Sequence, residues 1–226
     1  MLSAQFPHPP ENWGAAAPAV GQPWGWVPSV TSLAAVTALE HLNHRALRDT
    51  VITFRDTMKA HAAGINRLNV YPVPDGDTGT NMARTLDAVV AELDGADTEG
   101  ADGQNATCDA ISHGSLMGAR GNSGVILSQI LRGLAGTMKG ATPHAFPSGA
   151  TAIKVAEALK AASAAAYQAV LKPIEGTILT VVRESADAAH VAAHEGQSLA
   201  SVLHAARAAG KAALDRTPEM LPVLKD

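Results

Sequence analysis

Cysteine and aromatic residues are scarce in this chain. The single cysteine among 226 residues, Cys108, leaves no partner for an internal disulfide and too few thiolates for a multi-cysteine zinc site. A lone thiol fits a reducing cytoplasm. Aromatic residues make up only 4% of the chain, whereas hydrophobic residues reach 46%. The core must therefore be built from Ala, Val, Leu and Ile, and abundant alanine favours closely packed helices.

Basic charge and long apolar runs are also missing. The formal net charge is −4, which argues against a protein that binds nucleic acid or an anionic membrane. No run approaches the ~18 apolar residues of a membrane span. The N-terminus lacks the basic and apolar regions of a secretory signal. We therefore expect a cytoplasmic protein with no nucleic-acid partner and no membrane insertion.

Apolar residues that recur at helical spacing predict an all-α fold. Residues 80–93 carry such a stripe, and no alternating strand pattern of any length occurs. Short connections between the helices imply antiparallel neighbours. The predicted helices are residues 32–64 (one long helix or two), 80–93, 107–117, 123–139, 150–171, 177–193 and 198–214, followed by a last helix that begins near Pro218.

The first 31 residues differ in composition from the rest. They are rich in Pro, Gly and Ala, have no helical period and contain all three tryptophans, Trp13, Trp24 and Trp26. We interpret residues 1–31 as a flexible tail. A docking segment anchored by the tryptophans is the alternative. Residues 32–226 are expected to form one domain.

A proline-stiffened loop with two carboxylates is the most informative feature of the chain. Asp75 and Asp77 lie two residues apart, so in an extended chain they face the same side and suit a hard cation such as Mg²⁺. Gly76 and Gly79 permit a positive φ or a close approach to a ligand. Taken alone, Asp-Gly-Asp is more often a turn whose carboxylates cap the next helix.

The residues after this pair form a helix start that suits phosphate. Thr78, Gly79, Thr80 and Asn81 lie where the loop becomes a helix, and the free N–H groups of a helix N-terminus attract anions. Thr80 could equally be a plain N-cap. No phosphate-binding loop of the Walker type is present.

A second phosphate cradle is predicted at Gly121, Asn122, Ser123 and Gly124. The glycines allow the backbone to approach phosphate closely, and the helix that follows directs its N–H groups toward it. Asn122 and Ser123 could add side-chain donors. Arg120 could pair with a phosphate or cap the carbonyls around Met117, and the sequence does not choose between these roles.

Two long runs resemble the DhaL-like kinase domains. The run from Asn69 to Met82 is similar to the nucleotide-site loop of the bacterial fatty acid kinase branch, and the run from Gly118 to Gln129 is similar to a second family element. Weaker likenesses lie at residues 173–179 and 217–224. Thr78 stands where the dihydroxyacetone kinase branch has a histidine. The resemblance implies an antiparallel barrel or bundle of about eight helices with a nucleotide site at one end.

The resemblance also implies a kinase, a transferase that moves the γ-phosphoryl group of ATP. It assigns Asp75 and Asp77 as catalytic Mg²⁺ ligands, Asn69 as a further oxygen donor and Thr177 as a residue near the base. It makes ATP or ADP with Mg²⁺ the expected cofactors. The expected reaction yields an acyl phosphate from a fatty acid presented by a DegV-like carrier protein.

The sequence departs from the family pattern in ways that leave two alternative functions open. The family continues past position 226 with a further site loop and with domains for dimerisation and carrier contact, so we expect a domain truncated at its C-terminal end. An ADP-binding subunit of dihydroxyacetone kinase is the second reading, although no aspartate lies between Asn69 and Pro74. A non-catalytic nucleotide-binding module is the third.

Overall fold

The computed structural model describes residues 39–98, 102–139 and 149–224. The predicted tail, residues 1–31, lies outside these ranges. The described residues all lie in the compact unit Ala38–Asp226.

Within the described residues the chain is all-α, which confirms the predicted fold class. Residues 39–98, 102–139 and 149–224 contain seven α-helices where about eight were expected for the domain, and the only β-pairing in these ranges is an isolated bridge between Leu42 and Ala150. The elements are α1 (His44–Arg67), α2 (Thr78–Gly95), α3 (Gly103–Gly118), α4 (Gly121–Met138), α5 (Ala152–Gln168), α6 (Ile178–His194), α7 (Leu199–Met220) and the 3₁₀ turn η1 (Pro222–Leu224).

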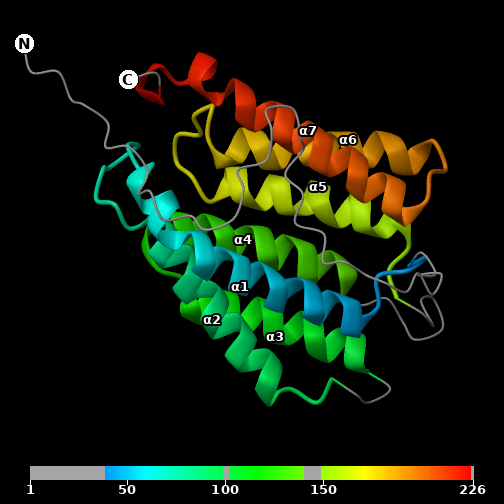
Figure 1. The fold of residues 1–226 in the computed structure, drawn as a ribbon. Helices are drawn as coiled ribbons and strands as arrows, with labels where there is room; N and C mark the ends of the chain where they lie inside the picture. Colours follow the sequence, from blue (N-terminus) through cyan, green and yellow to red (C-terminus); the bar gives the residue numbers. More distant parts are fainter. Residues whose placement is uncertain (1–38, 99–101, 140–148, 225–226) are drawn as a thin grey trace, which may run out of the picture. The chain divides into compact units, whose positions relative to one another are not determined.

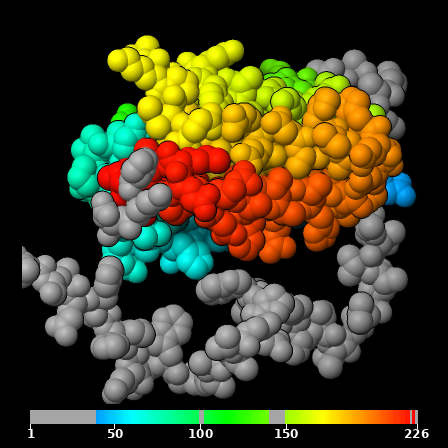
Figure 2. All heavy atoms as spheres, turned by 90° about the horizontal axis from the view of Figure 1, so that it is seen from above, coloured from blue at the N-terminus to red at the C-terminus, as the bar shows by residue number. Residues whose placement is uncertain are grey.

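Each helix packs against the next one along the chain (Figure 1). Because consecutive helices are antiparallel, the α1–α2, α3–α4 and α5–α6 connections lie at one end of the bundle, together with η1. Figures 1 and 2 agree in showing these segments on one side of the molecule. We call this side the acidic-loop end, after residues 68–77. Among the described helices, α1 and α7 do not approach each other as closely as consecutive helices do, although Leu199 at the start of α7 belongs to the same core cluster as Leu47 of α1.

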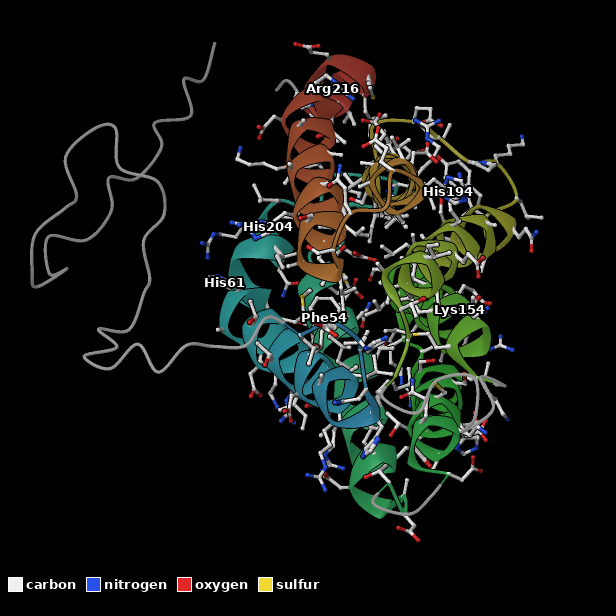
Figure 3. The ribbon with its side chains drawn as sticks, turned by 90° about the vertical axis from the view of Figure 1, so that its right-hand side faces the viewer. Phe54, His61, Lys154, His194, His204 and Arg216 are labelled. Atoms are coloured by element: carbon white, nitrogen blue, oxygen red, sulfur yellow. The ribbon has the colours of Figure 1, made fainter. Side chains whose placement is uncertain are left out.

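The core is aliphatic, and its composition changes along the bundle. Leu86, Val89 and Leu93 of α2 are fully buried against α1, α3 and α4. The part formed by α5, α6 and α7 is built mainly from alanine, as at Ala156 and Ala189. Figure 3 shows Phe54 of α1 directed between the helices, with Lys154 and His194 on the outside. Alanine lets helix backbones approach closely, which explains a core with so few aromatic residues.

The helical segment predicted for residues 32–64 is not continuous. The sequence pattern placed a helical segment from residue 32 to 64, but residues 39–43 are not helical and α1 begins at His44. The side chain of Asn43 accepts a hydrogen bond from the Ala46 N–H (2.9 Å), which fixes the start of α1. The helix then continues to Arg67, past the predicted stop at Gly64.

The prediction of a separate last helix starting at Pro218 is wrong. Pro218 lies inside α7. A proline lacks the N–H that would bond to the carbonyl four residues back, here that of Leu214. The Thr217 hydroxyl donates to that carbonyl instead (2.8 Å), and Leu221 N–H restores the backbone pattern by donating to Thr217 O (2.9 Å). The helix therefore passes through the proline.

None of the helices in the described part of the chain combines the length and the apolar character needed to cross a bilayer.

The buried thiol gives a test of this packing. Cys108 is fully buried on α3, and burial, followed by the nearby Asp109 carboxylate, raises the pKa of its thiol to about 12. We expect the folded chain to resist a thiol-specific reagent at neutral pH, because the reactive thiolate is absent and shielded. The unfolded chain should react at its one cysteine. Absorbance after addition of a disulfide reagent measures both states, and rapid labelling of the folded chain would contradict the packing of α3.

Candidate functional site

The acidic loop joins α1 to α2 and carries both predicted carboxylates. Asp75 is exposed and accepts a hydrogen bond from the Asn69 side-chain amide (Nδ2 to Oδ1, 2.7 Å). Gly76 between the two aspartates has φ +68°, the positive value foreseen for it. The amide oxygen of Asn69 and the second carboxylate oxygen of Asp75 have no hydrogen-bond partner within the described residues.

Asp77 occupies the N-cap position of α2 but does not act as a cap. Its backbone has φ −119° and ψ −2°, and its side chain makes no capping hydrogen bond. No hydrogen bond or ion pair of this carboxylate occurs within the described ranges. The alternative of a turn whose carboxylates cap the next helix is therefore not what the structure contains at Asp77. A partly exposed carboxylate without a protein partner is free to bind a cation.

The start of α2 is instead tied to α1 by a residue that the sequence analysis missed. Asn66 donates through Nδ2 to Thr80 Oγ1 (2.8 Å), and the Thr80 N–H donates back to Asn66 Oδ1 (3.1 Å). Thr80 is thus partnered and is not the N-cap. The pair connects residues 14 positions apart and fixes the entry of the loop relative to its exit.

The glycine corner before α4 meets the start of α2. The Ser123 hydroxyl donates to the carbonyl of Thr78 (3.4 Å), and Gly121 lies against the side chain of Asn81. Gly121 has φ +59°, and a Cβ atom there would lie 2.3 Å from Asn81 Nδ2. Only glycine satisfies both the backbone angle and this approach. Two segments 45 residues apart in sequence therefore form one site.

The two helix starts that meet here share a property. At α2 and α4 no N-cap side chain bonds to the helix, whereas Asn43, Thr151, Thr177 and Ser198 cap α1, α5, α6 and α7. Helix α3 also lacks a side-chain cap, but it starts at the opposite end of the bundle. Within the described residues, the N–H groups of Thr78 and Gly79 on α2 and of Gly121, Asn122 and Ser123 on α4 have no acceptor. Such paired helix N-termini suit a polyanion.

The remaining predicted residues of this region have structural contacts. Gly79 packs on α1, where a Cβ would lie 2.4 Å from Ala62 O, and Gly124 packs against the Thr85 hydroxyl. Asn122 is exposed at the corner. Arg120 donates to the carbonyls of Ala119 (2.8 Å) and Met117 (3.2 Å), which are the contacts of the predicted capping role.

The α5–α6 connection, residues 169–177, holds the last predicted site residue. Thr177 is the N-cap of α6 and accepts from Leu179 N–H (3.3 Å), while its hydroxyl donates to Ile174 O (2.8 Å). Its bonds are therefore local, and none reaches the acidic loop. The neighbouring Glu175 accepts hydrogen bonds from Tyr167, Thr180 and Arg183, which the sequence analysis missed. The available signal was its place inside the run 173–179, which resembles a family element.

Exposed apolar side chains are frequent at this end of the bundle. Most of the large hydrophobic residues that remain exposed in the described chain lie on the connections and helix ends around the acidic loop. We call this set the apolar collar: Leu68, Val70, Tyr71, Val73, Leu116, Met117, Leu171, Ile174, Met220 and Val223. A concentration of exposed apolar surface indicates a contact site.

The chemistry of the donor set fits one hard cation. Asp75, Asp77 and the amide oxygen of Asn69 are oxygen donors on one loop, and neither carboxylate is neutralised by a basic side chain within the described residues. No group of three or more His, Cys, Asp or Glu side chains capable of holding a metal occurs in that part of the chain. Mg²⁺ often takes only one or two carboxylates and fills its other positions with water and phosphate oxygens.

Comparison with known proteins identifies the family of the chain. The model of the DAK2 domain matches residues 72–226. Protein YloV of Bacillus subtilis is 39% identical over 189 residues, which cover 84% of this chain and 32% of that protein. The uncharacterized protein SSP1546 of Staphylococcus saprophyticus is 38% identical over 185 residues, 82% of this chain and 32% of its own length. The chain thus spans about a third of the length of these curated relatives. It belongs to the DAK2 domain family, whose members are related to the nucleotide-binding subunit of dihydroxyacetone kinase.

Proposed function

We propose that this chain is an ATP·Mg²⁺-dependent phosphotransferase domain of the fatty acid kinase type. The observation that carries the proposal is the meeting of two uncapped helix N-termini beside two carboxylates without basic partners. Positive helix ends bind phosphate oxygens, and carboxylates bind the cation that accompanies a nucleotide. The helix N-termini thus supply the phosphate-binding groups, and the acidic loop supplies the ligands of the cation.

Different residues of the site would bind the metal and the phosphates. Asp75, Asp77 and Asn69 would hold Mg²⁺, which when bound neutralises charge on the phosphates. The free N–H groups of Thr78, Gly79, Gly121, Asn122 and Ser123 would receive the phosphate oxygens. Asn66 and Asn81 keep the two helix starts in register, through the bonds to Thr80 and the contact with Gly121. Catalysis would rest on positioning and electrostatics.

The proposed acceptor is a fatty acid carboxylate presented by a DegV-like carrier protein. The bond between the γ-phosphorus and the bridging oxygen of ATP breaks, and a carboxylate oxygen bonds to that phosphorus to give acyl phosphate and ADP. Thr78 in place of the histidine of the dihydroxyacetone kinase branch supports this choice. The apolar collar supports an acceptor that arrives on a protein, because exposed apolar surface around a site is typical of a macromolecular contact.

The other two readings predict different behaviour. An ADP-binding subunit of dihydroxyacetone kinase would use a triose instead of a carboxylate. A nucleotide-binding module without turnover would bind Mg²⁺ and ATP but release no product. The second of these remains a specific alternative because the chain covers only 32% of protein YloV, so the whole protein's activity can require other domains.

Removing the unpartnered carboxylate tests the metal site. In Asp77→Asn we expect affinity for ATP in the presence of Mg²⁺ to fall by at least about tenfold, or about 1.4 kcal/mol. The melting temperature should fall only slightly, because Asp77 supports no cap and no ion pair within the described residues and loses only its charge interaction with the start of α2. Isothermal titration calorimetry with and without Mg²⁺ measures the effect. Asp94→Asn at the far end of α2, which breaks an ion pair with Arg48, is the control and should bind ATP as the parent does. Equal binding by Asp77→Asn would contradict the proposed metal ligand.

Two glycine-to-alanine variants of α4 test the glycine corner. In Gly121→Ala, the alanine would have to adopt the left-handed backbone of Gly121, and its Cβ would collide with the Asn81 side chain. We therefore expect nucleotide affinity to fall sharply. Gly136→Ala on the same helix meets nothing within 4 Å and should leave affinity unchanged while raising stability by about 0.5–1 kcal/mol. Calorimetric titration and thermal unfolding of both variants separate the two effects. If both variants bind ATP like the parent, the corner is not part of the site.

The acceptor is tested by trapping the product. With ATP, Mg²⁺ and a lipid-loaded DegV-like carrier, we expect an acyl phosphate that hydroxylamine traps, and no consumption of ATP with dihydroxyacetone. Met117→Asp places a charge in the apolar collar, where the Met117 side chain is 63% exposed. It should lower carrier-dependent turnover and leave ATP binding unchanged. Turnover with dihydroxyacetone would favour the second reading, and ATP binding without product from either acceptor would favour the third.

A further inference from the structure

Two histidines lie one turn apart at the end of α6 that is farther from the acidic loop. His190 and His194 are four residues apart, a spacing that puts two side chains on the same face of a helix. The centres of their rings are 4.0 Å apart. His190 is half-buried and His194 is exposed, and Figure 3 shows His194 on the outside of the bundle. We call His190 and His194 the histidine pair.

A backbone hydrogen bond fixes the tautomer of His194. Its Nδ1 lies 2.8 Å from the carbonyl oxygen of His190. A carbonyl oxygen only accepts, so Nδ1 carries the hydrogen and donates it, and the lone pair of the neutral ring is on Nε2. Imidazoles that bind metal ions in proteins commonly donate their other N–H to a backbone carbonyl in this way. The ring nitrogens of His190 make no hydrogen bond within the described ranges, so both rings have a nitrogen available for a ligand.

The backbone beneath the histidine pair is held in place by packing. Ala189 and Ala192, on the opposite face of the same turn, are buried in one cluster with Val202 of α7. The helix ends directly after the pair, where Gly196 has φ +76° and the Gln197 N–H donates to Ala192 O (3.1 Å). The two histidines cannot move apart without the loss of these contacts. Their spacing is therefore set before any ion binds, which lowers the cost of chelation.

The chemistry of two imidazoles selects the kind of ion. Imidazole nitrogen suits transition-metal ions such as Zn²⁺, Ni²⁺ and Cu²⁺, whereas Mg²⁺ prefers oxygen. Zinc–nitrogen bonds of about 2.0–2.1 Å put two tetrahedral ligands roughly 3.3 Å apart, and ring centres 4.0 Å apart are compatible with that separation. Asp187, one turn earlier on α6, is paired with Lys160 (2.5 Å). The histidine pair thus supplies two ligands, and water fills the remaining positions of the ion.

We propose that the histidine pair binds a divalent transition-metal ion such as Zn²⁺, through Nε2 of His194 and a ring nitrogen of His190. The site is independent of the proposed nucleotide site. His194 lies roughly 24 Å along α6 from Ile178, at about 1.5 Å per residue, and Ile178 marks the acidic-loop end of this helix. A bound ion joins the last two turns of α6 next to the α6–α7 connection. It therefore stabilises the hairpin that these two helices form.

Titration of the metal-free chain with Zn²⁺ tests the site. In His190→Gln and in His194→Gln, an amide replaces one imidazole ligand, so we expect affinity for Zn²⁺ to fall by at least about tenfold in each variant. Excess Mg²⁺ should not displace the zinc ion from the parent chain. Zinc should also raise the melting temperature of the parent and not that of the variants, because an ion that binds only the folded state stabilises it. Isothermal titration calorimetry and thermal unfolding measure these effects.

His113→Gln is the matched control. His113 is also an exposed histidine on a helix, but its Nδ1 faces the Glu92 carboxylate (3.2 Å) and not a second imidazole. This variant should bind Zn²⁺ as the parent does. Nitrogen-15 magnetic resonance of the parent gives a second readout that needs no variant. The metal-free His194 ring should carry its hydrogen on Nδ1, and added Zn²⁺ should shift the Nε2 signal of that ring.

Three outcomes would overturn the inference. Unchanged zinc affinity in both histidine-pair variants, or no shift of the His194 Nε2 signal, would show that the ion does not bind there. An equal loss in His113→Gln would assign the effect to non-specific binding by surface histidines. Displacement of zinc by Mg²⁺ would assign the ion to an oxygen site such as the acidic loop. None of these outcomes bears on ATP binding, so the proposed function stands or falls by its own tests.

Discussion

The contact between Gly121 and Asn81 is the constraint on which the site depends. It brings the starts of α2 and α4 together without a capping side chain on either, so two positive helix ends, each equivalent to about half an elementary charge, lie side by side. Like partial charges repel, so the arrangement costs stability unless an anion or nearby carboxylates offset it. Asp75 and Asp77 on the adjoining loop supply part of that offset. A polyphosphate with its cation would complete it.

Helix existence was predictable from the sequence, but helix ends were not. Leu86, Val89 and Leu93 recur at helical spacing, and this stripe predicts α2 because the three side chains are buried on one face of that helix. The continuation of α7 through Pro218 depends on the hydroxyl of Thr217, which substitutes for the missing N–H. Residue spacing contains no such information. The ends are decided by single side chains whose partners are known only once the backbone is folded.

The segments of the candidate site were also predictable from the sequence, whereas the contacts that assemble them were not. Runs of adjacent residues, such as the acidic loop and the glycine corner, could be found in the sequence because their chemistry is local. The bonds that assemble them join residues 14 positions apart at Asn66 and Thr80 and 45 apart at Ser123 and Thr78. Glu175 reaches partners eight residues away on either side, on two helices. Sequence proximity gives no reason to pair these residues, so the supporting contacts emerged only from the fold.

Exposure of the site bears on which acceptor the proposed chemistry can use. Asp75 is exposed, and the connections around it present the apolar collar to solvent. Phosphoryl transfer to a carboxylate competes with transfer to water, so water must be excluded from the acceptor position. The large apolar side chains at this end of the bundle, such as Met117 and Leu171, are exposed to solvent. A carrier seated on the collar would bring the carboxylate and exclude water in one step, since the same apolar surface serves both. On the proposed function, turnover therefore depends on docking of the carrier more than on any further side chain of this domain. Nucleotide binding, in contrast, does not depend on docking of the carrier.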